Sequence, residues 1–358
     1  MVFVKFFLFL SLIFQGFFFQ VNPQEISVMV VGDIMTHSPV VHSAYNPSNG
    51  QYNFESMFAE VKPIFAEADL VIGNLESPIA GDHLPFLGYP QFNAPVAIAP
   101  NLKNVGFDVL TTANNHAMDQ YEAGLINTLN VLDRYGIYHT GSARSAEEQA
   151  QGLIVDVSGI RLGIIAYTFG TNSIPLPAGK PYSVNLLNID LISKEVQTLK
   201  DRGADYIVAM IHYGVEYVRF PNAQQIEWTN QILDSGVDFV LGSHPHVVQP
   251  VEMKENGKVA IYSLGNFISN QTNEWKDYGV ILDLRLTKDF KTGKTTLTKV
   301  EAIPTYVERT PGIGRSDYLI HPLIEGYDKV NRTIQQRGRE LLQHLFSDEG
   351  KAIVEQAA

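Results

Sequence analysis

Short apolar runs rich in β-branched residues recur along this chain, and polar residues stand directly after five of them. The runs do not alternate with polar residues and have the length of strands buried on both faces. Longer segments with helical patterning separate them. This order predicts an α/β protein with buried strands between helices. The runs lie at Ile26–Val31, Leu70–Ile72, Val109–Thr112, Ile207–Ile211, Phe239–Leu241 and Val259–Tyr262.

Apolar residues recur at helical spacing in four of the segments that separate the runs. The predicted helices are Phe54–Ala68, Tyr121–Tyr135, Ile189–Arg202 and Ala223–Ser235. A hairpin is predicted where Ser158-Gly159 separates Leu153–Val157 from Arg161–Tyr167, because a two-residue Ser-Gly connection suits a tight turn.

The pattern changes after Phe267. Val280–Leu286 and Thr296–Ile303 predict antiparallel strands joined by Lys291–Lys294, and a final amphipathic helix is predicted over Tyr327–Phe346. The chain has no internal repeat, low-complexity tract or obvious linker. We therefore expect one α/β domain with a C-terminal extension of strands and a helix.

The N-terminal residues differ in kind from the rest of the chain. Lys5 precedes a nearly continuous apolar stretch, Phe6–Phe19, which is typical of a secretory signal or an uncleaved signal anchor. The stretch is shorter than the roughly 20 residues that a spanning helix needs, and whether it is cleaved stays open. We expect residues 1–24 to direct export to a periplasmic or extracellular location, free or membrane-anchored. The domain at 25–270 and its extension at 271–358 would follow.

Charge and the lack of cysteine narrow the function classes. The 38 acidic and 26 basic residues give a formal net charge of −12 over 358 residues. This argues against a general nucleic-acid binder, because such proteins neutralise phosphates with basic residues. The chain has no cysteine, which excludes disulfides, thiolate metal ligands and a cysteine nucleophile. Any bound metal must therefore be held by His, Asp, Glu or Asn.

Polar residues gather just after the predicted strands. Ligands of open α/β sheets bind beyond the carboxyl ends of the strands, so five strand ends can bring distant side chains to one place. The side chains are those of Asp33, Glu76, Asn114, Asn115, His116, His212, His244 and His246.

These residue types suit a pair of divalent metal ions, with Mn, Fe, Zn or Mg left open. Burying Asp33 beside Glu76 without cations would be costly, because like charges repel in a weakly screened site. Each cluster alone also has a simpler interpretation. Gly-Asp after a strand is often only a turn, Asn-Asn-His can be a turn with a capping Asn, and His212 can be a hydrogen-bonded core histidine. Their coincidence at five strand ends favours the metal site.

The clusters lie in six short motifs that resemble, in order, those of the CapA family of bacterial capsule-synthesis proteins, named for poly-γ-glutamate capsule synthesis. The resemblance covers about Ile26 to Phe267. The family is similar in turn to the calcineurin-like metallophosphoesterases, so the resemblance implies a four-layer α/β/β/α sandwich. The motifs are Gly32–Met35, Gly73–Glu76, Ala113–His116, His212–Glu216, Gly242–Val247 and Tyr262–Phe267.

The resemblance also implies roles for individual residues. Glu76 takes the place of a bridging aspartate, His212 and His244 would bind one metal, and His246 would bind the other. His116 would be the catalytic imidazole. The implied metal ligands are Asp33, Glu76, Asn115, His212, His244 and His246.

Two departures from the superfamily pattern concern the metal site. The superfamily usually has Asp-x-His in its first motif, but Met35 stands at the histidine position, and whether His37 reaches the site stays open. The second motif offers Glu76 where an aspartate is usual. Both changes bear on whether both metal sites are occupied and on the distance between the two ions.

Further residues near the motifs are candidates for substrate binding. Glu216 and Tyr217 closely follow a predicted ligand, and Asn114 and Asn266 lie within motifs. Each also has a plain structural interpretation as a loop or turn residue. The segment Tyr167–Pro181, rich in Thr, Asn, Pro and Gly, ends another strand and is a candidate substrate loop.

The pattern predicts a metal-dependent hydrolase. Two ions would lower the pKa of a bridging water, and His116 would stabilise developing charge or protonate the leaving group. A phosphoester and a γ-glutamyl amide both remain open as substrates. The rival is a non-enzymatic, membrane-associated component that binds, exports or tethers an anionic capsule polymer. The net charge of −12 does not suit a polyanion binder unless metals or a local basic patch reverse the sign.

Overall fold

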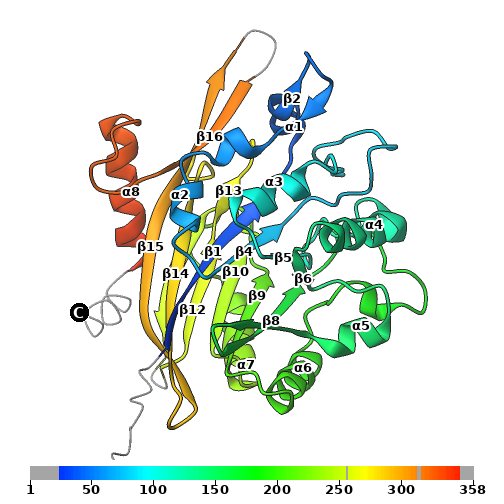
Figure 1. The fold of residues 1–358 in the computed structure, drawn as a ribbon, viewed down its shortest axis with the longest axis vertical. Helices are drawn as coiled ribbons and strands as arrows, with labels where there is room; N and C mark the ends of the chain where they lie inside the picture. The colour runs from blue at the N-terminus through cyan, green and yellow to red at the C-terminus, as the bar shows by residue number, and fades with distance from the viewer. Residues whose placement is uncertain (1–23, 255–256, 313–315, 347–358) are drawn as a thin grey trace, which may run out of the picture.

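Two β-sheets packed face to face form the centre of the protein, and helices cover both outer faces (Figure 1). The computed structural model describes residues 24–254, 257–312 and 316–346. Apolar side chains from the two inner faces fill the space between the sheets, as in other sheet-on-sheet packings. The arrangement is a four-layer α/β/β/α sandwich, which confirms the fold implied by the resemblance.

The first sheet joins strands from both ends of the chain. In spatial order it consists of β16 (Ser316–Pro322), β15 (Lys294–Pro311), β14 (Tyr278–Asp289), β1 (Gln24–Ile34), β4 (Leu70–Leu75), β5 (Val109–Thr111) and β6 (Tyr138–Thr140), with β13 (Asn266–Ile268) paired to β1. The strands from β1 to β6 run parallel, whereas β14 runs antiparallel to β1. The antiparallel pair predicted after Phe267 is confirmed as β14 and β15.

The second sheet has four parallel strands between two antiparallel edge strands. Its order is β11 (Val248–Met253), β12 (Val259–Leu264), β10 (Phe239–Ser243), β9 (Tyr206–His212), β8 (Ile160–Thr168) and β7 (Leu153–Val157). The predicted hairpin is confirmed as β7 and β8. Its turn residues Ser158 and Gly159 both have positive φ, as a tight two-residue turn between twisted strands requires.

Helices cover each outer face of the sandwich. The first sheet is covered by α1 (Ser38–Ala44), α2 (Lys62–Phe65), α3 (Ile98–Val105) and α4 (Tyr121–Arg134). The second is covered by α6 (Ile189–Asp201) and α7 (Ala223–Asp234), which lie side by side at the bottom centre of Figure 1. The remaining elements are β2 (Tyr45–Asn46), β3 (Gln51–Tyr52), η1 (Glu55–Phe58), α5 (Ala146–Gln151), η2 (Pro181–Ser183) and α8 (Arg332–Leu345), the last of which packs on β15 and β11.

Two helix predictions were partly wrong. The segment Phe54–Ala68 is not one helix but the short elements η1 and α2. Pro63 has no backbone N–H and is tolerated only in a first helical turn, so a new helix begins there. The last helix begins at Arg332 rather than Tyr327, because the Asn331 side chain caps it by accepting from the N–H of Ile334.

The predicted leader at residues 1–24 lies outside the described residues except for Gln24, which begins β1. Among the helices of the described ranges, none combines the length and the apolar character that crossing a bilayer requires.

Candidate metal centre

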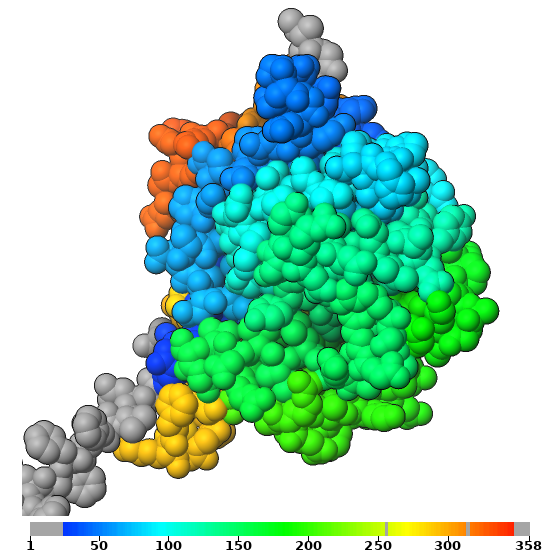
Figure 2. All heavy atoms as spheres, turned by 45° about the vertical axis from the view of Figure 1, so that its right-hand side comes forward, coloured from blue at the N-terminus to red at the C-terminus, as the bar shows by residue number. Residues whose placement is uncertain are grey.

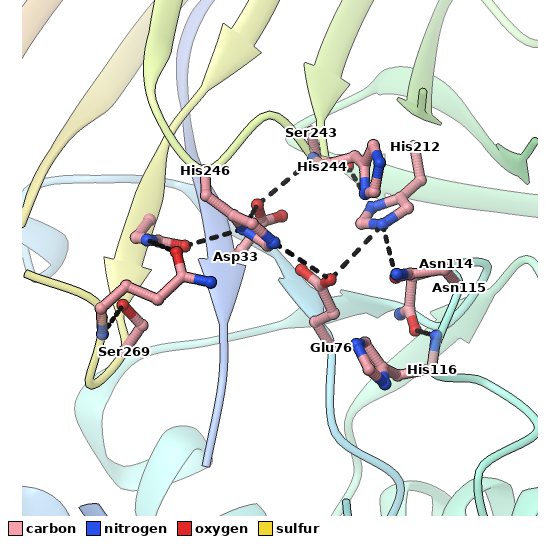
Figure 3. A network of polar contacts seen from close by, with 12 residues as sticks. Asp33, Glu76, Asn114, Asn115, His116, His212, Ser243, His244, His246 and Ser269 are labelled. Atoms are coloured by element: carbon pink, nitrogen blue, oxygen red, sulfur yellow. Dashed lines mark hydrogen bonds and ion pairs between the residues drawn. The ribbon is translucent and has the colours of Figure 1, made fainter. Parts of the chain in front are cut away.

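The carboxyl ends of parallel strands from both sheets meet at one place, and the polar residues of the motifs gather there (Figure 3). The first sheet contributes residues from β1 and from just beyond β4 and β5. The second contributes the last residue of β9 and the loop after β10. The side chains are at most 5% exposed and belong to Asp33, Glu76, Asn115, His116, His212, His244 and His246.

Two groups of potential metal ligands share Glu76. Ligand atoms of Glu76, His212 and His244 all lie within 4.8 Å of one another, and the same holds for Asp33, Glu76 and His246. Ligands at about 2.0–2.2 Å from a common ion lie about 4.4 Å apart at most, so each group needs only small shifts to hold one ion. A carboxylate common to both groups is the arrangement of a two-metal site.

The carboxylate of Glu76 receives no hydrogen bond from the described residues to offset the cost of its burial. Both of its oxygens are buried and have no hydrogen-bond partner. Burial, followed by the nearby charge of Asp33, raises the pKa of Glu76 well above its usual range. A buried carboxyl group without hydrogen bonds costs stability, and bound cations would offset that cost. The donor set of carboxylates, imidazoles and an amide therefore fits divalent ions such as Mn, Fe or Zn.

The imidazole of His212 is held in one orientation by both of its nitrogens. Nδ1 lies 2.9 Å from the Ser243 hydroxyl, and Nε2 lies 2.9 Å from Oδ1 of Asn115 and 3.4 Å from Oε1 of Glu76. Burial and the neighbouring His244 lower the pKa of His212 well below its ordinary value. A neutral ring fixed at one nitrogen presents the other to a ligand, as metal-binding histidines do.

The loop after β10 places two imidazoles on either side of Pro245. His244 and His246 have φ values of 96° and 58°, in the left-handed region that costs roughly 1–3 kcal/mol for such residues. Nδ1 of His246 lies 3.1 Å from Oδ2 of Asp33, and the His244 amide donates to the same oxygen at 3.3 Å. Burial, followed by the charge of His246, lowers the pKa of His244 to about 3. Nδ1 of His244 is buried and has no partner, which leaves it free for a metal.

Close backbone packing fixes the position of Asp33. Its amide donates to the carbonyl of Gly265 at 3.1 Å, and Asn74 Nδ2 donates to its Oδ1 at 2.8 Å. A Cβ at Gly32 would lie 1.9 Å from the same Gly265 carbonyl oxygen, so only glycine fits immediately before Asp33.

His116 forms a dyad with Asp119 at the edge of the centre. Its Nδ1 lies 2.7 Å from Oδ2 of Asp119, and its ring meets Phe92 edge-on at a centroid distance of 4.7 Å. The ring belongs to none of the ligand groups found in the described residues, yet its charge contributes to the lowered pKa values of His212 and His244. His116 thus lies beside the candidate ligands without being one of them.

Two of the four predicted substrate-binding residues are already engaged by the protein. Asn114 Nδ2 donates to the carbonyl of Leu75 at 2.8 Å, and Asn266 Nδ2 donates to the carbonyl of Lys276 at 2.8 Å. Oδ1 of Asn266 lies 3.1 Å from Nδ1 of His246. These amides hold the ligand loops in place, so their geometry is that of positioning residues.

Glu216 and Tyr217 lie at the opening of the centre. Glu216 is exposed, and its carboxylate forms a third potential ligand group with His244 and His246. Tyr217 is 43% exposed, and its amide donates to the carbonyl of Pro245 at 2.8 Å. Burial, followed by the charge of Glu216, raises the pKa of Tyr217 to about 12. These two residues remain available to a bound molecule.

His37 lies near the centre but does not join a ligand group of the described residues. Its Nδ1 accepts from the Asn270 amide at 3.3 Å, and its ring packs edge-on against Phe92 at 5.1 Å. Burial and the charges of His246 and His116 lower its pKa to about 4. His37 therefore contributes a neutral ring to the wall of the site.

Several side chains that were not predicted as site residues complete the centre. Asn74 stands inside a motif, and Asp119 follows His116 at a spacing that could have suggested a dyad. Asn172 Oδ1 accepts from Asn115 Nδ2 at 3.2 Å, and the ring of Phe169 lies 4.7 Å from that of His244. No sequence pattern marks these last two, although the segment that contains them was a candidate substrate loop.

A cavity of about 550 Å³ lies elsewhere, along β6, and includes none of the candidate ligands. Residues of its lining include His139, Arg144 and Glu195. Figure 2 faces this part of the molecule, where teal and green segments surround a hollow. The chemistry of the strand ends, rather than the volume of this cavity, therefore identifies the candidate centre.

Comparison with known proteins gives the family. The sequence profile described as "Bacterial capsule synthesis protein PGA_cap" matches residues 27–271, a range that contains every candidate ligand. The chain belongs to this family. Two relatives of this PGA_cap protein are the "PGA biosynthesis protein CapA" of Bacillus subtilis (strain 168) and the "Capsule biosynthesis protein CapA" of Bacillus anthracis. The first is 29% identical, and the match covers 79% of this chain and 74% of the relative. The second is 27% identical, and the match covers 69% of this chain and 61% of the relative.

Solved structures similar to this chain include one described as a calcineurin-like phosphoesterase and one described as an NAD nucleotidase. The calcineurin-like phosphoesterase YfkN from Bacillus subtilis has a TM-score of 0.46 at 15% identity, covering 90% of this chain and 98% of its own. The NAD nucleotidase NadN of Haemophilus influenzae has a TM-score of 0.49 at 15% identity, covering 91% and 64%. At these scores and identities, the family assignment of the PGA_cap protein rests on the sequence matches.

Proposed function

We propose that this PGA_cap protein is an exported hydrolase that depends on two divalent metal ions and acts in capsule or cell-envelope polymer metabolism. The observation that carries the proposal is the carboxylate of Glu76. It is fully buried, has no hydrogen-bond partner, and is shared by two groups of imidazole and carboxylate donors. A structural carboxylate would be hydrogen-bonded, whereas one that bridges two ions is compensated by the ions.

The residues of the two groups would divide the ligands between the ions. Asp33 and His246 would hold one ion, His212 and His244 would hold the other, and Glu76 would bridge them. When bound, such ions supply Lewis acidity and lower the pKa of a water molecule between them. Asn115 would complete the second group, since its Oδ1 lies 2.9 Å from Nε2 of His212. Cations between these donors would also relieve the repulsion between the Asp33 and Glu76 carboxylates.

His116 would act as the acid–base group of the reaction. The carboxylate of Asp119, 2.7 Å from Nδ1, fixes the orientation of the ring and favours a proton at Nδ1. The other nitrogen, Nε2, would then deliver a proton to the leaving group when the ring is protonated. Phe92 packs edge-on against the same ring and limits its rotation.

The substrate that we propose is a phosphoester or a γ-glutamyl amide within an anionic polymer. Support for a capsule polymer comes from the names of the two CapA relatives, which describe PGA and capsule biosynthesis. The net charge of −12 would disfavour a polyanion at most of the surface, so the cations of the centre would supply the local attraction. The apolar stretch Phe6–Phe19 supports export and an attachment to the membrane through the N-terminus.

The test is an assay of the purified full-length protein after loading with Mn²⁺, Zn²⁺, Fe²⁺ or Mg²⁺. Substrates are aryl phosphate esters and γ-glutamyl anilides, and metal content is measured on the same samples. We expect turnover that disappears in a His244→Ala, His246→Ala double variant. Lack of turnover with every metal and both substrate classes would overturn the hydrolase proposal, leaving a component that binds or tethers polymer. Polymer binding that survives in the double variant would support that rival.

A further inference from the structure

A third carboxylate stands at the opening of the centre. Glu216 follows β9, and its carboxylate oxygen lies within 4.8 Å of imidazole nitrogens of His244 and His246. Unlike Asp33 and Glu76, which are fully buried, Glu216 is exposed and faces any molecule that approaches. The charge of Glu216 also contributes to the raised pKa values of Glu76 and Tyr217. Its electrostatic effect therefore reaches the buried carboxylate as well as the exposed tyrosine.

The buried carboxylates of the centre have no ion pair with Lys or Arg in the part of the chain that the structure describes. None of the hydrogen bonds and ion pairs of Asp33, Glu76, His212 or His246 involves Lys or Arg. At the rim, Nζ of Lys276 lies 4.9 Å from the ring centre of Tyr217 and 4.0 Å from the carboxylate of Glu274. Two divalent ions would carry four positive charges against three carboxylates, and an ionised water would cancel the remainder. The charge of Glu216 would therefore reduce the attraction of the cations for a doubly charged group more than for a singly charged one.

Aromatic rings border both halves of the centre. Phe169 lies 4.7 Å from the ring of His244 and stacks parallel to that of His212 at 6.4 Å. Tyr217 lies 6.0 Å from the ring of His246, in the other ligand group. Both rings are partly open to solvent, at 44% and 43% exposure. A molecule that reacts above Glu76 would therefore meet an aromatic surface on each side.

We propose that the centre acts on phosphodiester linkages inside a longer chain, and that Glu216 disfavours terminal phosphate monoesters. A diester carries one negative charge, so Glu216 repels it less than a doubly charged group. It also has a substituent on each side of phosphorus, and these can contact the rings of Phe169 and Tyr217. A monoester carries up to two charges and has only one substituent. The inference rests on the proposed hydrolase function and names its substrate class. In the reaction the P–O bond to one substituent breaks, a hydroxyl from water joins phosphorus, and the departing oxygen takes a proton.

The first experiment compares substrates on the full-length, Mn²⁺-loaded protein. Bis(p-nitrophenyl) phosphate, p-nitrophenyl phosphate and γ-glutamyl-p-nitroanilide release the same type of chromophore and test diester, monoester and amide. We expect a kcat/KM for the diester at least about tenfold above that for the monoester. Preference for the monoester, or turnover of the anilide alone, would overturn the phosphodiester inference while leaving the hydrolase proposal intact. Turnover of none of the three would overturn the hydrolase proposal itself.

Two sets of variants assign the selectivity to residues. In Glu216→Gln the ratio of monoester to diester kcat/KM should rise about tenfold, whereas the charge control Glu227→Gln, on an exposed face of α7, should leave that ratio unchanged. In Phe169→Ala and Tyr217→Ala the KM for the diester should rise several-fold with a smaller change in kcat. Phe290→Ala removes a ring of 44% exposure on a distant hairpin and serves as the control.

A binding measurement makes the result independent of turnover. Diphenylphosphinate carries one charge and two rings, whereas phenylphosphonate carries up to two charges and one ring. Calorimetry on the metal-loaded protein should show tighter binding of diphenylphosphinate, and Glu216→Gln should tighten only phenylphosphonate. Metal content measured on each sample identifies any variant that has lost its ions. Equal affinity for the two anions, unchanged in Glu216→Gln with its metals retained, would overturn the role given to Glu216.

Discussion

Nε2 of His212 lies 3.4 Å from Oε1 of Glu76, and both side chains are completely buried. The neighbouring His246 places its Nε2 3.9 Å from the same carboxylate oxygen. Two imidazoles of the second sheet, one at the end of β9 and one in the loop after β10, thus approach the carboxylate that follows β4 of the first sheet. The Glu76 carboxylate is therefore the contact point between the two sheets at this site. It is also the residue that the two candidate ligand groups have in common.

Single substitutions should separate the two ions. If Glu76 bridges them, His212→Ala and His246→Ala should each retain about one bound ion, and Glu76→Ala should retain less than one. Wild-type protein should hold two. Elemental analysis after gel filtration in Mn²⁺ or Zn²⁺ measures the stoichiometry. His42→Ala, whose side chain lies on α1 outside the ligand groups of the described residues, is the matched control. Two ions retained in Glu76→Ala would contradict the shared ligand.

His116 should matter for turnover without holding metal. His116→Ala should lower kcat by about 10²–10⁴-fold, the range for loss of a general acid, while metal content stays at the wild-type value. Asp119→Asn should lower kcat by a smaller factor, because the carboxylate that orients the ring is lost. Loss of metal in His116→Ala would instead assign the ring to the ligands.

Asn172, in the candidate substrate loop, contacts both Asn115 and His116. Its Oδ1 accepts from Asn115 Nδ2 at 3.2 Å, and its Nδ2 lies 3.4 Å from Nδ1 of His116. Asn172→Ala should lower kcat by about tenfold with little change in KM, because the Asn115 amide can then rotate away from His212. Asn172→Asp, which keeps the acceptor, should restore part of the rate. Unchanged kinetics in Asn172→Ala would show that the contact has no positioning role.

The convergence of the candidate ligands could be anticipated because carboxyl ends of parallel strands share one edge of a sheet. Asp33, His212 and His246 lie far apart in sequence, but each stands at such an end. The motif order then pointed to the CapA family. The pairing of β1 with β14, which brings residues about 250 positions apart into register, has no comparable sequence signal. Strand order depends on such long-range contacts, which the local pattern does not encode.

The sequence did not predict the side chains that contact the candidate ligands without being candidates themselves. Asn172 has an ordinary loop environment in the sequence, and its contact with Asn115 joins residues 57 positions apart. Phe169 is one of many apolar residues near strand ends. For the segment Phe54–Ala68 the sequence predicted too much rather than too little. Its apolar residues have helical spacing, but Pro63 divides the segment into two short helices. Local patterns therefore located the ligands better than they located the residues that support them.

Glu195 should make stability depend on pH. Burial raises its pKa from 4.5 to about 7, even though the Tyr167 hydroxyl donates to it at 2.6 Å. The folded state thus holds a proton that the unfolded chain releases near pH 4.5. The resulting stabilisation is complete below that pH and is lost as the pH rises to about 7. Glu195→Gln cannot ionise, so its Tm relative to wild type should rise by a few degrees between pH 4.5 and 7.5. A difference that stays constant with pH would contradict this.

Gly32 should be indispensable because the backbone of Gly265 fills the space where its side chain would lie. A Cβ there would be 1.9 Å from a carbonyl oxygen that also accepts from the Asp33 amide. Gly32→Ala must therefore displace β1 from the loop before β13, at a cost of about 1–3 kcal/mol in unfolding free energy. The displacement should also weaken metal binding, because Asp33 moves with it. Gly170→Ala, where a Cβ has open space, is the control for denaturation and metal titration. A Gly32→Ala protein with wild-type stability and affinity would show that this close approach does not position the ligand.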